Sequence, residues 1–162
     1  MLALIDGGSP ELPLLLLLRS SGLHSHPGQV GLPGGSPLPG DGPLWRTALR
    51  EAEEELQVPG DAVELCGRAT VVAIRNSGFA VTPFVGLLRR SFEPRAAADE
   101  VEAFFWLPLL PGGGRPVRVA RRVTVSGGSF EATGYPAGEH FVWGATGKIV
   151  DDLLTRLGLP PS

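Results

Sequence analysis

Apolar blocks separated by turn formers predict the first secondary-structure elements of this chain. Residues 1–5 and 12–18 are almost continuously apolar, which is typical of buried strands. The cluster of turn formers at 6–10 lies between them and indicates an opening hairpin. Residues 19–31 look irregular and lead to Pro33-Gly34-Gly35. Consecutive glycines allow a sharp turn there, and they let another group approach the backbone closely.

The spacing of apolar residues changes to that of a helix after this turn. Between residues 44 and 58, apolar side chains recur every three or four positions and leave the acidic residues on the other side. The apolar positions are Trp45, Ala48, Leu49, Ala52 and Leu56. Pro59 and Gly60 end the predicted helix, because proline cannot continue a helix and glycine suits the residue beyond its end.

Further strands are predicted after the helix. Residues 63–75 and 79–88 are expected to form a second hairpin across a turn at 76–78. Residues 101–107 predict another strand, which Pro108 stops because proline cannot donate a hydrogen bond within a sheet. This segment therefore adds another strand to the predicted sheet.

The C-terminal part of the chain adds one strand and a helix to the prediction. Alternating valines in 117–125 favour a strand, and the apolar spacing of 143–157 predicts an amphipathic helix. The inward positions of this helix are Ile149, Val150, Leu153, Leu154 and Leu157. Strands on both sides of one helix, closed by another, predict an α+β fold with a mixed sheet sandwiched between helices. A length of 162 residues predicts one domain, 1–162.

Composition and charge narrow the class of protein. A formal net charge of -3 offers no basic surface for a phosphate backbone, which argues against nucleic-acid binding. Cys66 is the only cysteine, so the chain has no internal disulfide and no thiolate zinc cluster. The apolar run 12–18 is short and follows Asp6 and Glu11, which argues against a signal peptide or membrane span. We expect a cytoplasmic protein, and the sequence leaves its oligomeric state open.

Three carboxylates gather on the predicted central helix. Glu51, Glu54 and Glu55 stand at i, i+3 and i+4, which puts them on one helix face, where like charges repel. Divalent cations such as Mg²⁺ or Mn²⁺ prefer oxygen ligands of this kind, and a bound cation would neutralise the repulsion. Taken alone, the run is also typical of a solvated acidic helix face.

The surroundings of these carboxylates favour the metal site. Arg50 precedes them directly, and Gly34-Gly35 lies in the loop before the helix. Together these residues resemble the Nudix box, in which a glycine turn precedes a helix with the pattern Arg-Glu-apolar-any-Glu-Glu. Residues 50–56 fit that pattern, whereas Gln57 stands where the box usually has glycine. The resemblance implies the Nudix fold and hydrolysis of a diphosphate in a small-molecule substrate.

Departures from the general box resemble one branch of the family, the coenzyme A pyrophosphatases. The interval from Gly35 to Arg50 is one residue longer than the general pattern allows, and it contains Asp41 instead of the usual Glu. That branch also has an upstream signature, to which residues 15–35 correspond in spacing. Three positions of the signature differ: Leu17 replaces Thr, His24 replaces Arg, and Leu32 replaces Phe. The segment 142–146 also looks like the closing segment of this branch.

The resemblance implies roles for individual residues. Glu54 and Glu55 would be the principal metal ligands, with Glu51 and the backbone carbonyl of Gly35 as further ligands. Arg50 would orient the glutamates. Bound Mg²⁺ or Mn²⁺ would neutralise the diphosphate oxygens, position the attacking water and lower its pKa.

Other residues are candidates for a catalytic base and for substrate contacts. Glu100 matches the family's Glu-Val before a strand and is the candidate base, with Glu102 as the alternative. Arg19 suits bidentate phosphate binding, and its alternative role is to cap a buried strand. His24 and His26 would face one side of an extended segment and contact metal or phosphate, although histidines of this kind are also common on exposed loops.

Three functions remain open from the sequence. The first is hydrolysis of coenzyme A or a derivative to 3',5'-ADP and 4'-phosphopantetheine or its acyl form, as the resemblance implies. The second is hydrolysis of another nucleoside diphosphate derivative, such as ADP-ribose or a dinucleotide. The third is a Nudix-fold module that binds nucleotides without turnover, which a broken acidic cluster would favour, whereas the cluster here is intact.

Overall fold

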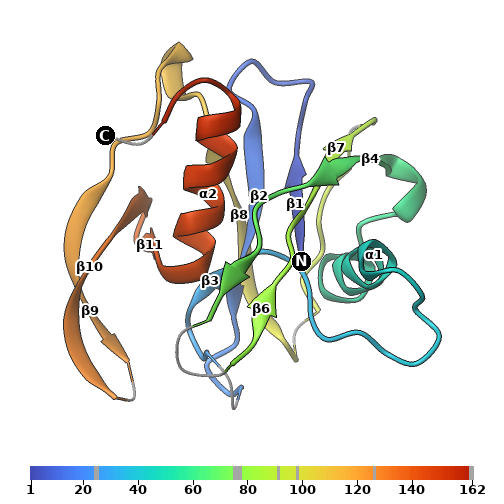
Figure 1. Ribbon diagram of the computed structural model, residues 1–162, viewed down its shortest axis with the longest axis horizontal. Helices are drawn as coiled ribbons and strands as arrows, with labels where there is room; N and C mark the ends of the chain where they lie inside the picture. Colours follow the sequence, from blue (N-terminus) through green and yellow to red (C-terminus); the bar gives the residue numbers. More distant parts are fainter. Residues whose placement is uncertain (24–25, 75–77, 91, 98, 126, 161–162) are drawn as a thin grey trace.

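A mixed β-sheet lies between two helices in the computed structural model (Figure 1). The structure describes residues 1–23, 26–74, 78–90, 92–97, 99–125 and 127–160. The sheet contains β1 (Leu2–Ile5), β2 (Pro13–Arg19), β3 (Val30–Gly31), β4 (Val63–Arg68), β7 (Phe84–Leu88) and β8 (Val101–Pro108). Because β1 pairs antiparallel with β2 but parallel with β7, the sheet is mixed. The predicted α+β class and the opening hairpin are confirmed.

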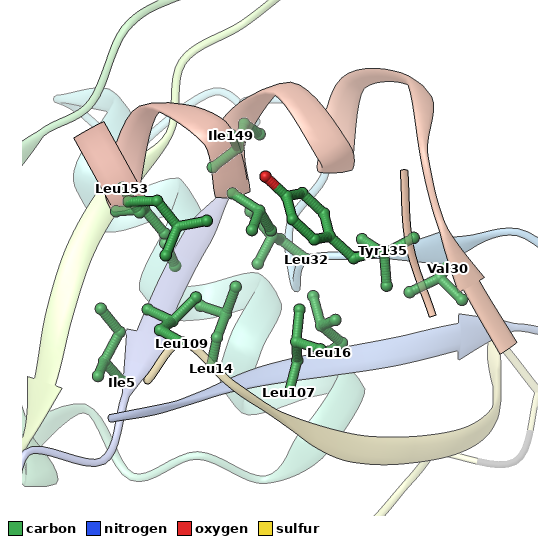
Figure 2. Packing of buried hydrophobic residues seen from close by; sticks show 14 of the residues in the cluster. Ile5, Leu14, Leu16, Val30, Leu32, Leu107, Leu109, Tyr135, Ile149 and Leu153 are labelled. Carbon is green, nitrogen blue, oxygen red and sulfur yellow. The ribbon is translucent and has the colours of Figure 1, made fainter. Parts of the chain in front are cut away.

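Each face of the sheet packs against one helix, α1 (Leu44–Leu56) or α2 (Gly144–Arg156). Successive side chains of a strand point to opposite faces, so the apolar runs of β1 and β2 supply both sides of the sheet. The α1 side contains Leu2, Leu4, Leu15 and Leu17 with Ala48, Ala52 and Leu56. The α2 side contains Ala3, Ile5, Leu14 and Leu16 with Ile149, Val150, Leu153 and Leu154 (Figure 2). The predicted sandwich of helices around the sheet is therefore confirmed.

The hairpin predicted over 63–75 and 79–88 is present, but both of its strands are interrupted. β4 pairs with β7 in the main sheet, while β5 (Val72–Ala73) and β6 (Ala80–Val81) form a separate two-stranded sheet. The register of β4 shifts just before Gly67, and Pro83 lies between β6 and β7, where it cannot donate to a strand neighbour. Residues 76 and 77 of the predicted turn lie outside the described residues.

Two strands near the C-terminus were not predicted from the sequence. β10 (Gly128–Ala137) and β11 (His140–Val142) join β9 (Val119–Val125) in an antiparallel three-stranded sheet. The sequence did not indicate β10 because it contains Gly134 and Pro136, and both residue types are depleted in strands. Two short 3-10 turns, η1 (Gly60–Ala62) and η2 (Pro111–Gly113), complete the fold. Among the described residues, no helix is long and apolar enough to span a lipid bilayer.

Tyr135 of β10 ties this small sheet to α2. Its side chain is fully buried on the α2 side of the core, and its hydroxyl points toward the helix (Figure 2). The hydroxyl donates a hydrogen bond to Asp151, and Arg118 lies 3.6 Å from the same carboxylate. Burial, then the nearby carboxylate, raises the pKa of Tyr135 above its ordinary value. The hydroxyl therefore remains a donor at neutral pH.

Candidate active site

The glycine turn meets the acidic helix through Glu55. The backbone N–H of Gly34 donates a hydrogen bond of 2.8 Å to Oε2 of Glu55, which is only 3% exposed. Gly34 has φ of +144°, and a Cβ there would lie 2.5 Å from the Cα of Met1. Glycine is therefore required by both conformation and space. The helix pattern predicted that Glu55 faces solvent with the other acidic residues. Instead, its side chain turns inward to accept this bond.

Gly35 brings its backbone against Glu51. A Cβ at Gly35 would lie 2.7 Å from all three atoms of the Glu51 carboxyl group. The predicted close approach of another group to this turn is thus present, and the group is a carboxylate from the helix. Two of the three box glutamates therefore lie against the two glycines.

Arg50 holds the exposed side of the cluster. Its guanidinium lies 2.8 Å from Glu51 Oε1 and 2.7 Å from Glu54 Oε2. It also donates to both carboxylate oxygens of Asp41, at 3.0 and 3.2 Å. The hydrogen bond from Arg50, followed by that from the Leu38 backbone, lowers the pKa of Asp41 to about 2. Arg50 is thus fixed by a carboxylate from the preceding loop while it orients two glutamates.

Asp41 is a residue to which sequence reasoning gave no role. Besides binding Arg50, it accepts hydrogen bonds from the Leu38 N–H at 2.9 Å and from the buried Thr47 hydroxyl at 2.8 Å. It thereby closes the loop before α1 and anchors that loop to the first turns of the helix. The signal in the sequence was an acidic residue in the interval where the box expects one.

Arg19 and Glu100 reach the same region from neighbouring strand ends. Arg19 is the last residue of β2, and its Nη1 lies 3.8 Å from Glu55 Oε1. Glu100 precedes β8, and its carbonyl accepts a hydrogen bond of 2.9 Å from the Ser20 N–H. Burial raises the pKa of Glu55 to about 7; the Gly34 N–H and Arg19 oppose the rise, and the charges of Glu51 and Glu100 add to it. The charge of Glu100, the candidate base, is thus the smallest of these influences on Glu55.

The segment before Glu100 is fastened to the end of α1. The N–H of Arg95 donates to the carbonyl of Leu56 at 3.1 Å, and that of Ala97 to the carbonyl of Glu55 at 2.9 Å. These bonds satisfy carbonyls that the helix end leaves without partners. Glu102 lies between Val101, which pairs with Arg19, and Ala103, which pairs with Leu18, so it falls at a register shift of β8.

Of the two candidate histidines, the structure describes His26. His24 lies outside the described residues. His26 is exposed in the loop after β2, with φ of +54°, and its Nδ1 lies 3.1 Å from Oε1 of Gln29. Substrate contact by either histidine stays a prediction.

The oxygen donors of the cluster suit a hard divalent cation, although its carboxylates do not converge. Among the residues that the structure describes, no group of three or more His, Cys, Asp or Glu side chains is arranged to hold a metal ion. The reason is local: Arg50 pairs with Glu51 and Glu54, while Glu55 turns toward Gly34. The Glu54 side chain is 57% exposed, so it is free to change rotamer at little cost. The donor set of Glu51, Glu54, Glu55 and the Gly35 carbonyl fits Mg²⁺ or Mn²⁺ chemically.

Comparison with known sequences identifies the family. The sequence model of the NUDIX domain matches residues 1–110, which is more than half of the chain. The chain belongs to the Nudix family. Its curated relatives include an uncharacterised Nudix hydrolase, NudL, of Escherichia coli O1:K1 / APEC. That Nudix protein is 38% identical over 156 residues, which cover 94% of this chain and 79% of the relative.

Solved structures agree with the Nudix fold. A C. elegans Ap4A hydrolase binary complex superposes with a TM-score of 0.57 at 19% identity, over 67% of this chain and 77% of that one. A MutT Nudix hydrolase from Burkholderia pseudomallei superposes with a TM-score of 0.50 at 28% identity. The match covers 67% of this chain and 81% of that one. The family and these relatives support the predicted class, a Nudix hydrolase acting on a phosphoric anhydride.

Proposed function

We propose that this protein is a divalent-metal-dependent pyrophosphohydrolase that cleaves the diphosphate of coenzyme A or its derivatives. The products would be 3',5'-ADP and 4'-phosphopantetheine, or its acyl form. The observation that carries the catalytic part is the meeting of Gly34 and Gly35 with Glu55 and Glu51. This contact joins the two halves of the Nudix box, which lie far apart in sequence, into one cluster of oxygen donors.

The residues of the cluster have distinct roles in this proposal. Glu51, Glu54, Glu55 and the Gly35 carbonyl would hold Mg²⁺ or Mn²⁺, which neutralises the diphosphate and lowers the pKa of water. Arg50 keeps Glu51 and Glu54 beside the glycine turn, and Asp41 keeps Arg50 in place. Arg19 supplies a positive charge at the end of β2, where phosphate oxygens would bind.

Besides the divalent cation, the reaction needs a water molecule and a base. The water oxygen attacks one phosphorus atom as Glu100 takes a proton from it, and the bond from that phosphorus to the bridging oxygen breaks. The bridging oxygen leaves with the other phosphate, so the products are two phosphate monoesters. Glu100 suits this role because it is exposed directly before β8 and its backbone is bound to Ser20, the neighbour of Arg19.

The choice of coenzyme A rests on the sequence. The longer interval with Asp41 and the spacing of residues 15–35 resemble the coenzyme A branch. The substitutions at Leu17, His24 and Leu32 favour a second candidate, another nucleoside diphosphate derivative such as ADP-ribose or a dinucleotide. A binding module without turnover is the third possibility, and the intact acidic cluster weighs against it.

The test is a direct comparison of substrates. Purified protein would be incubated with coenzyme A, ADP-ribose, a dinucleotide and a nucleoside triphosphate, each with Mg²⁺, Mn²⁺ or a chelator. We expect metal-dependent release of 3',5'-ADP from coenzyme A, with a higher kcat/KM than for the other substrates. If ADP-ribose or the dinucleotide is cleaved preferentially, the assigned substrate is wrong, but the proposed metal-dependent cleavage of a diphosphate stands. No cleavage of any substrate, despite measurable nucleotide binding, would favour the binding module.

A further inference from the structure

A groove lies at the end of β8 that is remote from Glu100. Its volume is about 400 Å³, and it is lined by 105–108 of β8 and 136–140 of the β10–β11 turn. The site already described is at the other end of the same strand, where Glu100 precedes β8 and Arg19 ends β2. The groove is therefore separate from the catalytic cluster but is connected to it by one strand.

The walls of the groove are suited to an apolar guest. The rings of Phe105 and His140 stack against each other in its lining, with centroids 4.9 Å apart and planes inclined by 18°. Leu107 is buried beside them, and Pro108 and Pro136 contribute further apolar surface. Glu139 is the exposed, charged residue of the lining. An uncharged chain would gain contact area here, while a negatively charged end would meet Glu139.

The edge of β8 offers a path between the two ends. β8 pairs with β2 on one side, and within the described part of the chain no strand pairs along its other side. Unpaired N–H and C=O groups of an edge strand can bind the amides of an extended ligand. The pantetheine arm of coenzyme A contains two amides in an extended chain.

The length of this path matches the arm. The five steps from Glu100 to Phe105 span roughly 16 Å at the usual rise of a strand. The pantetheine arm from diphosphate to sulfur is also roughly 15 Å long when extended, by ordinary bond lengths. A diphosphate held near Glu55 would thus place the sulfur, and any acyl group on it, at the groove.

We propose that this groove is an acyl-chain subsite, reached by a pantetheine arm that runs along the free edge of β8. The proposal rests on the proposed function, because it takes a coenzyme A thioester as the substrate. It assigns to Phe105 and His140 the selection of the acyl chain rather than any part in bond cleavage. The preferred substrates are then thioesters with an uncharged, apolar acyl group.

The experiment measures kcat/KM for coenzyme A and for a series of thioesters with saturated acyl chains of increasing length. Each methylene buried in the groove should raise kcat/KM relative to coenzyme A by up to about fourfold. H140A removes one wall of the groove, so kcat/KM should depend less on acyl-chain length. The change should appear in KM rather than in kcat. F141A is the matched control, because Phe141 is the adjacent aromatic and packs against Arg121 outside the groove. The series should keep its slope in F141A.

A second variant avoids any dependence on core packing. Glu139 is exposed in the turn after β10, so E139K should fold normally and should raise the relative kcat/KM of thioesters whose acyl chain ends in a carboxylate. Equal chain-length slopes in wild type and H140A, no gain for carboxylate-ended thioesters in E139K, and cleavage of coenzyme A would together overturn the groove assignment alone. If neither coenzyme A nor any of its thioesters is cleaved, the proposed function fails as well.

Discussion

Glu55 Oε2 accepts a hydrogen bond of 2.8 Å from the N–H of Gly34, a residue 21 positions earlier in the chain. This bond is buried, and it holds the glycine turn against the acidic helix. Because Gly35 follows in the same turn, the contact also places the backbone beside Glu51. The geometry of the proposed metal site therefore depends on two glycines as much as on its carboxylates.

These two glycines should respond differently to substitution by alanine. Gly34→Ala puts a Cβ 2.5 Å from the Met1 backbone at a φ of +144°, so we expect a loss of about 2 kcal/mol or more in the free energy of unfolding. Gly35→Ala meets only the movable end of Glu51, so stability should fall less while activity falls strongly. Urea unfolding and kcat with Mg²⁺ would measure both. Equal loss of stability in the two variants would contradict this distinction.

Glu54 should be dispensable for folding but not for turnover. Its side chain is 57% exposed and pairs with Arg50 in an i,i+4 contact, which contributes little to stability. Glu54→Gln removes a charged metal ligand in our proposal, so kcat should fall about 100-fold or more at an almost unchanged Tm. Glu53→Gln is the control, since Glu53 is an exposed neighbour on the same helix. Unchanged activity of Glu54→Gln would remove Glu54 from the metal site.

The stability of the metal-free protein should depend on pH through Glu55. Burial raises the pKa of this carboxyl from 4.5 to about 7, so the folded state binds more protons than the unfolded state between these values. The contribution of Glu55 to stability is present below about pH 4.5 and is lost as the pH rises to about 7. Urea unfolding with chelator at several pH values would measure this loss. Glu55→Gln, which has no charge to bury, should reduce the pH dependence and be more stable relative to wild type at pH 8.

Hydrophobic patterning predicted most of the sheet and both helices because their buried faces have a simple period. The leucines of β2 alternate between the α1 and α2 sides, and Ala48, Ala52 and Leu56 mark the inner face of α1. β10 had no such signal, since it contains glycine and proline and exposes most of its residues. Its position is set by long-range contacts such as that of Tyr135 with Asp151.

The site was predictable in its residue types but not in its geometry. Spacing alone put Glu51, Glu54 and Glu55 on one helix face, whereas hydrogen bonds to the preceding loop decide where each carboxylate points. Glu55 binds the Gly34 amide, and Arg50 holds the other two. The part played by Asp41 also depends on this loop, whose path to the helix no local pattern reveals.

Replacing Gln57 by the glycine that the Nudix box usually has should make this protein more stable. It ends α1 in the left-handed region, with φ of +55°, where the Nudix box usually has glycine. The Val58 N–H then donates to the Ala52 carbonyl at 3.2 Å, as in a glycine-terminated helix. A left-handed residue with a Cβ costs roughly 1 kcal/mol, so Gln57→Gly should raise the free energy of unfolding by about 0.5–1 kcal/mol. Gln57→Ala keeps the Cβ and should bring no such gain.

The choice between Glu100 and Glu102 as the base follows from their places on β8. Glu100 directly precedes β8 and its charge acts on Glu55, while Glu102 lies at the register shift between Val101 and Ala103. Glu100→Gln should therefore lower kcat by about 100-fold, a typical contribution of general-base catalysis. KM should change little, because the carboxylate acts on water rather than on substrate. Glu102→Gln, the matched control two residues away, should retain kcat, and the opposite pattern would move the base to Glu102.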